Sequence, residues 1–206
     1  MRQRQTGFTL VELAIVLVII GIIIGAVLKG QDLIQNARAK KFVSKVKSWE
    51  VAQWTYFDRE GRFAGDYNGN GIIGDDATNA SVKADLTSAS FINPPYEGTA
   101  GSETNTITLG SYQFYVFFGN DGTRNIMVLC KDSACSSTFT TEELTYINSF
   151  DTAFDGKADG TDGQVIGAGT PGSVSTSTWI ATYTTTPTAK AFSSASAVVY
   201  YFDAKR

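Results

Sequence analysis

The sequence predicts an α+β protein in which one long N-terminal helix is followed by a small antiparallel sheet. The first proline of the chain is Pro94, and no glycine stands between residues 30 and 61. Nothing therefore interrupts a helical pattern that runs from about Phe8 to Glu60. Strand signals begin only after residue 100, where aromatic and β-branched runs are bounded by turn residues.

The first part of the predicted helix, residues 8–28, is apolar except for one acid, Glu12, and follows a short basic leader, residues 1–7. These 21 residues would form a helix about 31 Å long at roughly 1.5 Å per residue. That length crosses a hydrocarbon core of about 30 Å. A carboxylate in such a segment costs about 2.5–3.5 kcal/mol on insertion scales. The pattern therefore predicts a membrane helix in which Glu12 has a function.

Two simpler interpretations of this segment are a secretory signal peptide and a signal anchor. A signal peptide has an apolar region of about 7–15 residues and a small-residue cleavage site. The run here is longer, and no such site follows Leu28. A signal anchor fits the hydropathy but has no use for Glu12. Basic residues lie on both sides of the run, so the positive-inside rule alone does not orient it.

The second part of the predicted helix carries an apolar stripe at steps of three and four residues, with lysines between its members. The stripe consists of Ala39, Phe42, Val43, Val46, Trp49, Ala52 and Tyr56. Such a one-sided pattern predicts an amphipathic helix that lies against a globular domain.

The predicted strands are residues 106–109, 112–118, 125–129 and 198–202. The turn Gly119-Asn120-Asp121-Gly122 separates the second from the third and predicts an antiparallel hairpin. Thr140 and Glu143 form a capping-box pattern, which predicts a short helix from about Thr141 to Phe150. The Ser/Thr-rich residues 173–188 are expected to form an exposed loop or an edge strand.

Composition excludes several kinds of chemistry. The chain has no histidine, so a Ser-His-Asp triad, a Cys-His dyad and a histidine metal site are all absent. Its net charge of −3 does not favour a nucleic-acid binder. Trp49, Trp54 and Trp179, if exposed, could stack on nucleotides, but such residues more often pack a helix against a sheet. We do not expect nucleic acid as a partner.

The two cysteines, Cys130 and Cys135, stand at C-x4-C spacing. A metal site would need further cysteine or histidine ligands, and a redox pair would be expected at C-x-x-C spacing. The remaining interpretation is a small disulfide loop in an oxidising compartment, with two free thiols as the alternative.

Residues 66–76 begin like a calcium-binding loop, with oxygen-bearing side chains at alternating positions and a glycine for the turn. The candidate ligands are Asp66, Asn68, Asn70, the backbone carbonyl of Ile72, Asp75 and Asp76. The usual glutamate at the twelfth position is replaced by Ala77, so Asp75 or Asp76 would have to complete a shortened shell. The alternative is a glycine-rich turn that binds nothing.

A second acidic, glycine-rich stretch, residues 151–163, is a weaker candidate for ion binding, because Asp-Gly steps mostly signal tight turns.

The residues around Glu12 resemble the type IV prepilin signature, which also occurs in the pseudopilins of type II secretion systems. The matching residues are Gly7, Phe8, Thr9, Leu10, Val11, Glu12 and Leu13. The resemblance implies that a dedicated peptidase cleaves after Gly7 and methylates Phe8. It also implies that Glu12 pairs with the amine of Phe8 in a neighbouring subunit, since a paired charge in lipid costs less than a bare one. Gly21 and Gly25 form a small-xxx-small pair that lets assembling helices approach closely.

The resemblance implies a pilin-like chain in four parts. They are a leader (1–7), a transmembrane and assembly helix (8–28), its amphipathic continuation (29–60) and a globular α+β domain (61–206). The expected partners are other pilin or pseudopilin subunits, the prepilin peptidase, the inner-membrane assembly platform and the lipid bilayer. The N-terminus would lie in the cytoplasm before processing and the globular domain outside it, and the mature chain would enter a filament.

The function expected from these features is that of a structural subunit, a minor pilin or a pseudopilin. The alternative is a membrane-anchored extracytoplasmic binding module, an adhesin or a DNA-uptake receptor, that does not polymerise. An enzyme is disfavoured because the chain lacks histidine and a nucleophile motif.

Overall fold

The computed structural model describes residues 9–76 and 78–203. Within these ranges the chain forms three α-helices, one 3-10 helix and seven strands, which confirms the predicted α+β class. The chain divides into two compact units, an N-terminal unit that ends at Arg38 and a globular unit that begins at Ala39. Each unit is described separately below.

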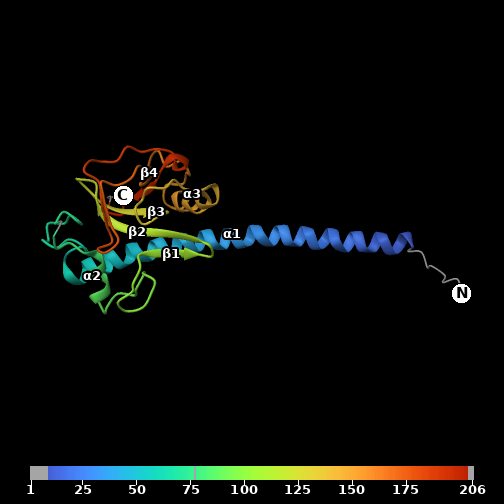
Figure 1. Ribbon diagram of the computed structural model, residues 1–206, viewed down its shortest axis with the longest axis horizontal. Coiled ribbons are helices and arrows are strands. Elements are labelled where there is room, and N and C mark those ends of the chain that lie inside the picture. The colour runs from blue at the N-terminus through green and yellow to red at the C-terminus, as the bar shows by residue number, and fades with distance from the viewer. Residues whose placement is uncertain (1–8, 77, 204–206) are drawn as a thin grey trace. The chain divides into compact units, whose positions relative to one another are not determined.

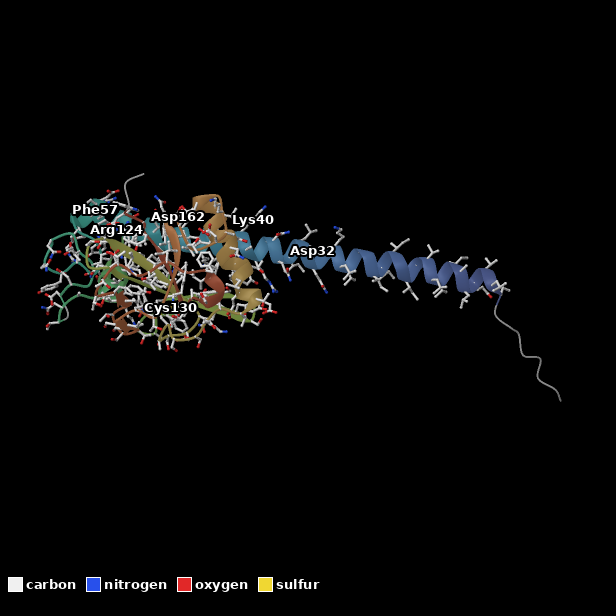
Figure 2. All side chains as sticks on the ribbon, turned by 90° about the horizontal axis from the view of Figure 1, so that it is seen from above. Asp32, Lys40, Phe57, Arg124, Cys130 and Asp162 are labelled. Atoms are coloured by element: carbon white, nitrogen blue, oxygen red, sulfur yellow. A yellow bond between two sulfur atoms is a disulfide. The ribbon has the colours of Figure 1, made fainter. Side chains whose placement is uncertain are left out.

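Helix α1, Leu10–Glu60, confirms the predicted long helix over the described residues. From Leu10 to Leu28 it exposes apolar side chains, which Figure 2 shows as sticks around the helix. The most apolar part of this helix has no buried residue, and by length and composition the helix could cross a membrane. A helix that is apolar all round is stable in lipid or against other helices, not in water.

The part of α1 in the globular unit buries the predicted stripe except for Val43, which is partly buried against the same core. Its buried residues are Ala39, Phe42, Val46, Trp49, Ala52, Gln53 and Tyr56. Figure 2 labels Lys40 towards the beginning and Phe57 towards the end of this part of the helix. The rings of Phe42 and Phe114 approach to 4.8 Å, and Trp49 packs against Phe118 of the sheet. The prediction of an amphipathic helix lying against a globular domain is therefore confirmed.

The sheet has the strand order β4-β7-β3-β2-β6-β5, and β1 pairs with β2. Figure 1 labels β1 to β4. The strands are β1 Thr106–Leu109, β2 Tyr112–Asn120, β3 Asn125–Cys130, β4 Val165–Ala168, β5 Ser173–Ser175, β6 Ile180–Thr182 and β7 Ala197–Tyr200. All pairs are antiparallel except β2 with β6. The parallel pair depends on Gly119, where a Cβ atom would lie 1.9 Å from the carbonyl oxygen of Ala181.

The four predicted strands are all present, and the predicted hairpin is β2–β3. Strand β3 is buried at every position. One face of the sheet packs against α1 and α3, and the other carries a second apolar cluster that includes Cys135 and Tyr183. Burial on both faces explains why β3 reads as a continuous apolar run.

Helix α3, Thr141–Asp155, begins where the capping box predicts and ends five residues later than expected. The Thr140 hydroxyl accepts from the Glu143 backbone N–H, and the Glu143 carboxylate accepts from the Thr140 backbone N–H. Gly156 ends the helix with a φ of 76°, a left-handed conformation that glycine adopts without strain.

Three elements were not predicted: helix α2, Val82–Ser88, the 3-10 helix η1, Phe192–Ser194, and strand β4. The Ser/Thr-rich segment contains the short strands β5 and β6 at one end of the sheet order, consistent with the expected edge strand. Trp49 and Trp179 are not exposed, as stacking on nucleotides would require: they are 0% and 1% exposed, and their rings meet edge to face at 5.6 Å in the core between helix and sheet. Trp54, the third tryptophan, is 37% exposed.

The capping box of α3 should contribute measurably to the stability of the globular unit. Thr140→Ala should lower the free energy of unfolding by about 0.5–2 kcal/mol, because the N–H of Glu143 loses its acceptor. Denaturant unfolding of the full chain in detergent micelles measures this loss. Thr145→Ala, at an exposed position inside α3, is the control and should be neutral or slightly stabilising. Equal losses in both variants would contradict a role for the cap.

Candidate assembly helix and acidic loops

The N-terminal end of α1 holds Glu12 in a local hydrogen-bonded arrangement. The Oε2 atom of Glu12 accepts from the Thr9 backbone N–H at 2.9 Å and from the Thr9 hydroxyl at 2.7 Å. The Glu12 N–H in turn donates to the Thr9 hydroxyl oxygen at 3.3 Å. These bonds cap the first turn, but they supply no positive charge to the carboxylate. Gly7 and Phe8, the predicted processing residues, lie outside the described residues.

Gly21 and Gly25 leave two positions without side chains on α1. A Cβ atom at either glycine would meet nothing within 4 Å in this chain. Neither glycine is therefore required for packing within the N-terminal unit as described. Their surroundings leave room for another helix to approach closely.

The loop at residues 66–76 is organised by Asp66, which is fully buried. Its Oδ1 accepts from the backbone N–H groups of Gly69 and Asn70, and its Oδ2 accepts from that of Gly71. Hydrogen bonds within the loop therefore use both oxygens of this predicted ligand.

The remaining predicted ligands gather on the exposed side of the same loop. The Asp75 carboxylate accepts from the side-chain amides of Asn68 and Asn70. The Ile72 N–H donates to Asn70 Oδ1 at 2.8 Å. Asp76 instead accepts from the backbone N–H groups of Thr78 and Asn79, and those bonds lower its pKa. Among the described residues, no three His, Cys, Asp or Glu side chains are placed to hold a metal. Calcium binding here stays a prediction.

Two asparagines of the β2–β3 hairpin fix the loop to the sheet. Asn125 donates to the Gly71 carbonyl at 2.7 Å and accepts from the Ile73 N–H at 2.8 Å. Asn120 donates to the Ile73 carbonyl at 2.8 Å. The sequence did not predict this docking. Asparagine is common beside turns, so Asn120 and Asn125 indicated only the turn between β2 and β3. Nothing in the sequence pairs them with a segment about 50 residues earlier.

A second tether joins the end of α1 to α2. The Arg62 guanidinium pairs with the Asp85 carboxylate at 2.9 Å and donates to the Tyr56 hydroxyl at 2.9 Å. Asp85 also accepts from the Gly65 N–H. Burial, followed by the nearby Asp85 charge, raises the pKa of Tyr56 to about 12. This cluster was not predicted, because Asp85 lies in α2 and that helix was not predicted either.

The predicted disulfide between Cys130 and Cys135 is present, with Cα atoms 5.0 Å apart. It closes the loop that follows β3. Within that loop, Asp132 accepts from the backbone N–H groups of Ala134, Ser136 and Ser137. Both cysteines are fully buried, so the bridge is part of the apolar cluster on the second face of the sheet.

The second acidic stretch connects α3 to β4. Asp151 is 1% exposed, and its Oδ2 accepts from the N–H groups of Asp159 and Gly160. Asp155 accepts from the Val165 N–H at 2.8 Å. The two aspartates thus hold the intervening loop against the end of the helix.

Comparison with known proteins identifies one segment. Residues 2–28 match the family model described as the prokaryotic N-terminal methylation motif. No curated protein and no solved structure matches the chain. The matched segment contains the predicted cleavage position, Glu12 and the apolar part of α1. The chain therefore carries at its N-terminus the signature of type IV pilins and pseudopilins.

Proposed function

We propose that this chain is a structural subunit of a type IV pilus or of a type II secretion filament, either a minor pilin or a pseudopilin. The observation that carries the proposal is the methylation motif at residues 2–28, on a helix whose apolar side chains are exposed all round. A structural role also agrees with the absence of histidine from the chain.

The apolar part of α1 would first anchor the chain in the inner membrane and later pack in a filament core. Its exposed surface includes Leu17, Ile20 and Ile24, and the open sides of Gly21 and Gly25 offer close approach to a neighbouring helix. The partners would be other pilin or pseudopilin subunits, the prepilin peptidase and the membrane assembly platform. The globular unit would lie outside the cytoplasm, where its disulfide is stable.

Glu12 would direct the register between subunits. Thr9 satisfies part of its hydrogen bonding within one chain, but only a cation neutralises its charge. The amine created at Phe8 by cleavage is such a cation, and a neighbouring subunit would bring it to Glu12. An unpaired carboxylate in hydrocarbon is costly, so a subunit lacking this partner would be disfavoured.

Processing is the first expected outcome. Cleavage between Gly7 and Phe8 removes the leader, so the membrane form should lack residues 1–7 and carry one added methyl group at its N-terminus. Intact-mass measurement of the chain purified from membranes of a host with a prepilin peptidase tests this. The same chain from a host without the peptidase is the control and should keep its leader. A mature chain cut beyond Leu28 would contradict the proposal.

Glu12→Ala should leave membrane insertion intact, because it removes a charge from lipid. It should strongly reduce the amount of subunit in sheared filaments, because the neighbouring amine loses its partner. Asp32→Ala is the matched control, since Asp32 is another exposed acid of α1 outside the apolar segment. The pairing role of Glu12 is excluded if both variants assemble as well as the parent.

Calcium at residues 66–76 is a separate prediction, supported by the ligand pattern of the sequence. For affinities of about 10⁻⁴–10⁻³ M, millimolar calcium should stabilise the chain by about 1 kcal/mol. Thermal melts of the full chain in calcium and in chelator measure the effect. Asp66→Ala should abolish the contribution of this loop, and so should Asp75→Asn, which changes an exposed side chain. Unchanged calcium responses in both variants would show that this loop is only a turn.

A further inference from the structure

The C-terminal end of α3 gathers negative charge where a helix least favours it. Asp151 and Asp155 stand one turn apart in the last part of the helix, and its last turn contains no basic residue. The C-terminus of a helix carries the negative end of the helix dipole, which disfavours anions and attracts cations. Two more acids, Asp159 and Asp162, follow in the loop to β4. Lys157 is the one basic residue between the end of the helix and these acids.

The loop closes tightly over these carboxylates. Asp151 and Asp155 each use one oxygen, Oδ2, to accept backbone N–H groups of the segment that leads into β4. A Cβ atom at Gly163 would lie 2.4 Å from Asp155 Oδ2. A Cβ atom at Gly160 would lie 2.7 Å from the ring of Phe192. The backbone thus covers the Asp151 carboxylate, whereas Asp155 stays partly exposed at the edge of the loop.

One oxygen in this enclosure has no partner. Asp151 is 1% exposed, and its Oδ1 makes no hydrogen bond. A buried acceptor left in this state is costly. The Asp155 side chain lies within hydrogen-bonding range of Asp151, but a second carboxylate cannot donate unless one of the two is protonated. Burial raises the pKa of Asp151 to about 6, and the negative charge of Asp155 contributes to the rise.

No basic side chain of the described residues pairs with the Asp151 or Asp155 carboxylate. No ion pair between described residues includes Asp151 or Asp155. The Lys47 ammonium group lies over the ring of Phe154, 5.0 Å from its centroid, and so is engaged on a neighbouring side chain. Within the described chain, the two carboxylates therefore have no basic side chain as a counter-charge.

We propose that Asp151 and Asp155 bind a calcium ion at the C-terminal end of α3. Calcium prefers oxygen ligands and accepts irregular arrangements of six to eight of them. Two carboxylates balance its charge, and carbonyl groups at a helix C-terminus are available as further ligands because the helix leaves them unpaired. Only two acidic side chains take part, so carbonyls and water must complete the shell. An affinity in the extracellular range, about 10⁻⁴–10⁻³ M, follows.

Bound calcium would hold the end of α3, the loop to β4 and β4 itself together. The site is distinct from residues 66–76, and it does not depend on filament assembly. Asp66 in the first loop already uses both oxygens in hydrogen bonds, whereas Asp151 retains a buried oxygen for a ligand. This difference favours the end of α3 as a calcium site.

The test uses the full chain in detergent micelles with Asp75→Asn, so that the first loop does not contribute. Thermal melts at neutral pH are compared in chelator and in rising calcium chloride. The melting temperature should rise by several degrees and saturate in the millimolar range. Adding Asp151→Asn should abolish the rise, and Asp155→Asn should reduce or abolish it. Asp162→Asn, the loss of an exposed acid in the same loop, should leave it unchanged.

Asparagine at position 151 keeps an acceptor for the loop N–H groups and removes the buried charge. The Asp151→Asn variant should therefore melt no lower than its parent in chelator, which separates loss of binding from loss of folding. A parent that becomes more stable on mild acidification, with no response to calcium, would overturn the proposal and show that the carboxylates share a proton. A calcium response that survives Asp151→Asn would also overturn it.

Discussion

The packing of the buried stripe of α1 against β2 is the interaction on which the globular unit depends. Phe42 meets Phe114 near one end of the contact, and Trp49 meets Phe118 and Trp179 further along. Large aromatic side chains bury much apolar area with few rotatable bonds, so they dominate the energetics of such a contact. The same helix is exposed and apolar in the N-terminal unit. Its sequence thus changes from an all-round apolar surface, which ends at Leu28, through a mostly polar segment to a one-sided stripe that begins at Ala39.

Three aspartates hold the loops around this core in the same way, by accepting hydrogen bonds from backbone N–H groups. Asp66, Asp132 and Asp151 each accept two or more backbone N–H groups from the segment that follows. A loop has no ladder of its own, so a short carboxylate supplies the acceptors that its N–H groups need. The three sites differ in what remains unsatisfied. Asp66 and Asp132 use both oxygens, whereas Asp151 has an unpartnered buried oxygen. The same arrangement therefore leaves no carboxylate oxygen over at Asp66 and Asp132 but leaves one at Asp151.

Local signals predicted the long helix, four strands, the capping box at Thr140 and the disulfide, because each is encoded by neighbouring residues. Helix α2 and the 3-10 helix η1 were missed because they are short, and other missed features depend on distant residues. Strand β4 is only four residues long, and it is paired by β7 from the end of the chain. Gly119 reads as part of a turn, yet it lies in β2 and permits the close approach of β6. The docking of residues 66–76 by Asn120 and Asn125 is likewise a contact that no local pattern contains.

The hydrogen bonds between Thr9 and Glu12 suggest a physical reason for both residues of the N-terminal signature. Thr9 donates two hydrogen bonds to the carboxylate, so the side chain is held near the beginning of α1 before any partner arrives. Hydrogen bonds from neutral donors orient a charge without neutralising it. In lipid, the remaining cost of the bare carboxylate favours any arrangement that brings a cation to it. The amine released by cleavage would be placed at the end of a helix of the same kind, at the same depth in the membrane. Orientation by Thr9 and neutralisation by a neighbour would then act in sequence, and the charge would favour assembled helices over separate ones.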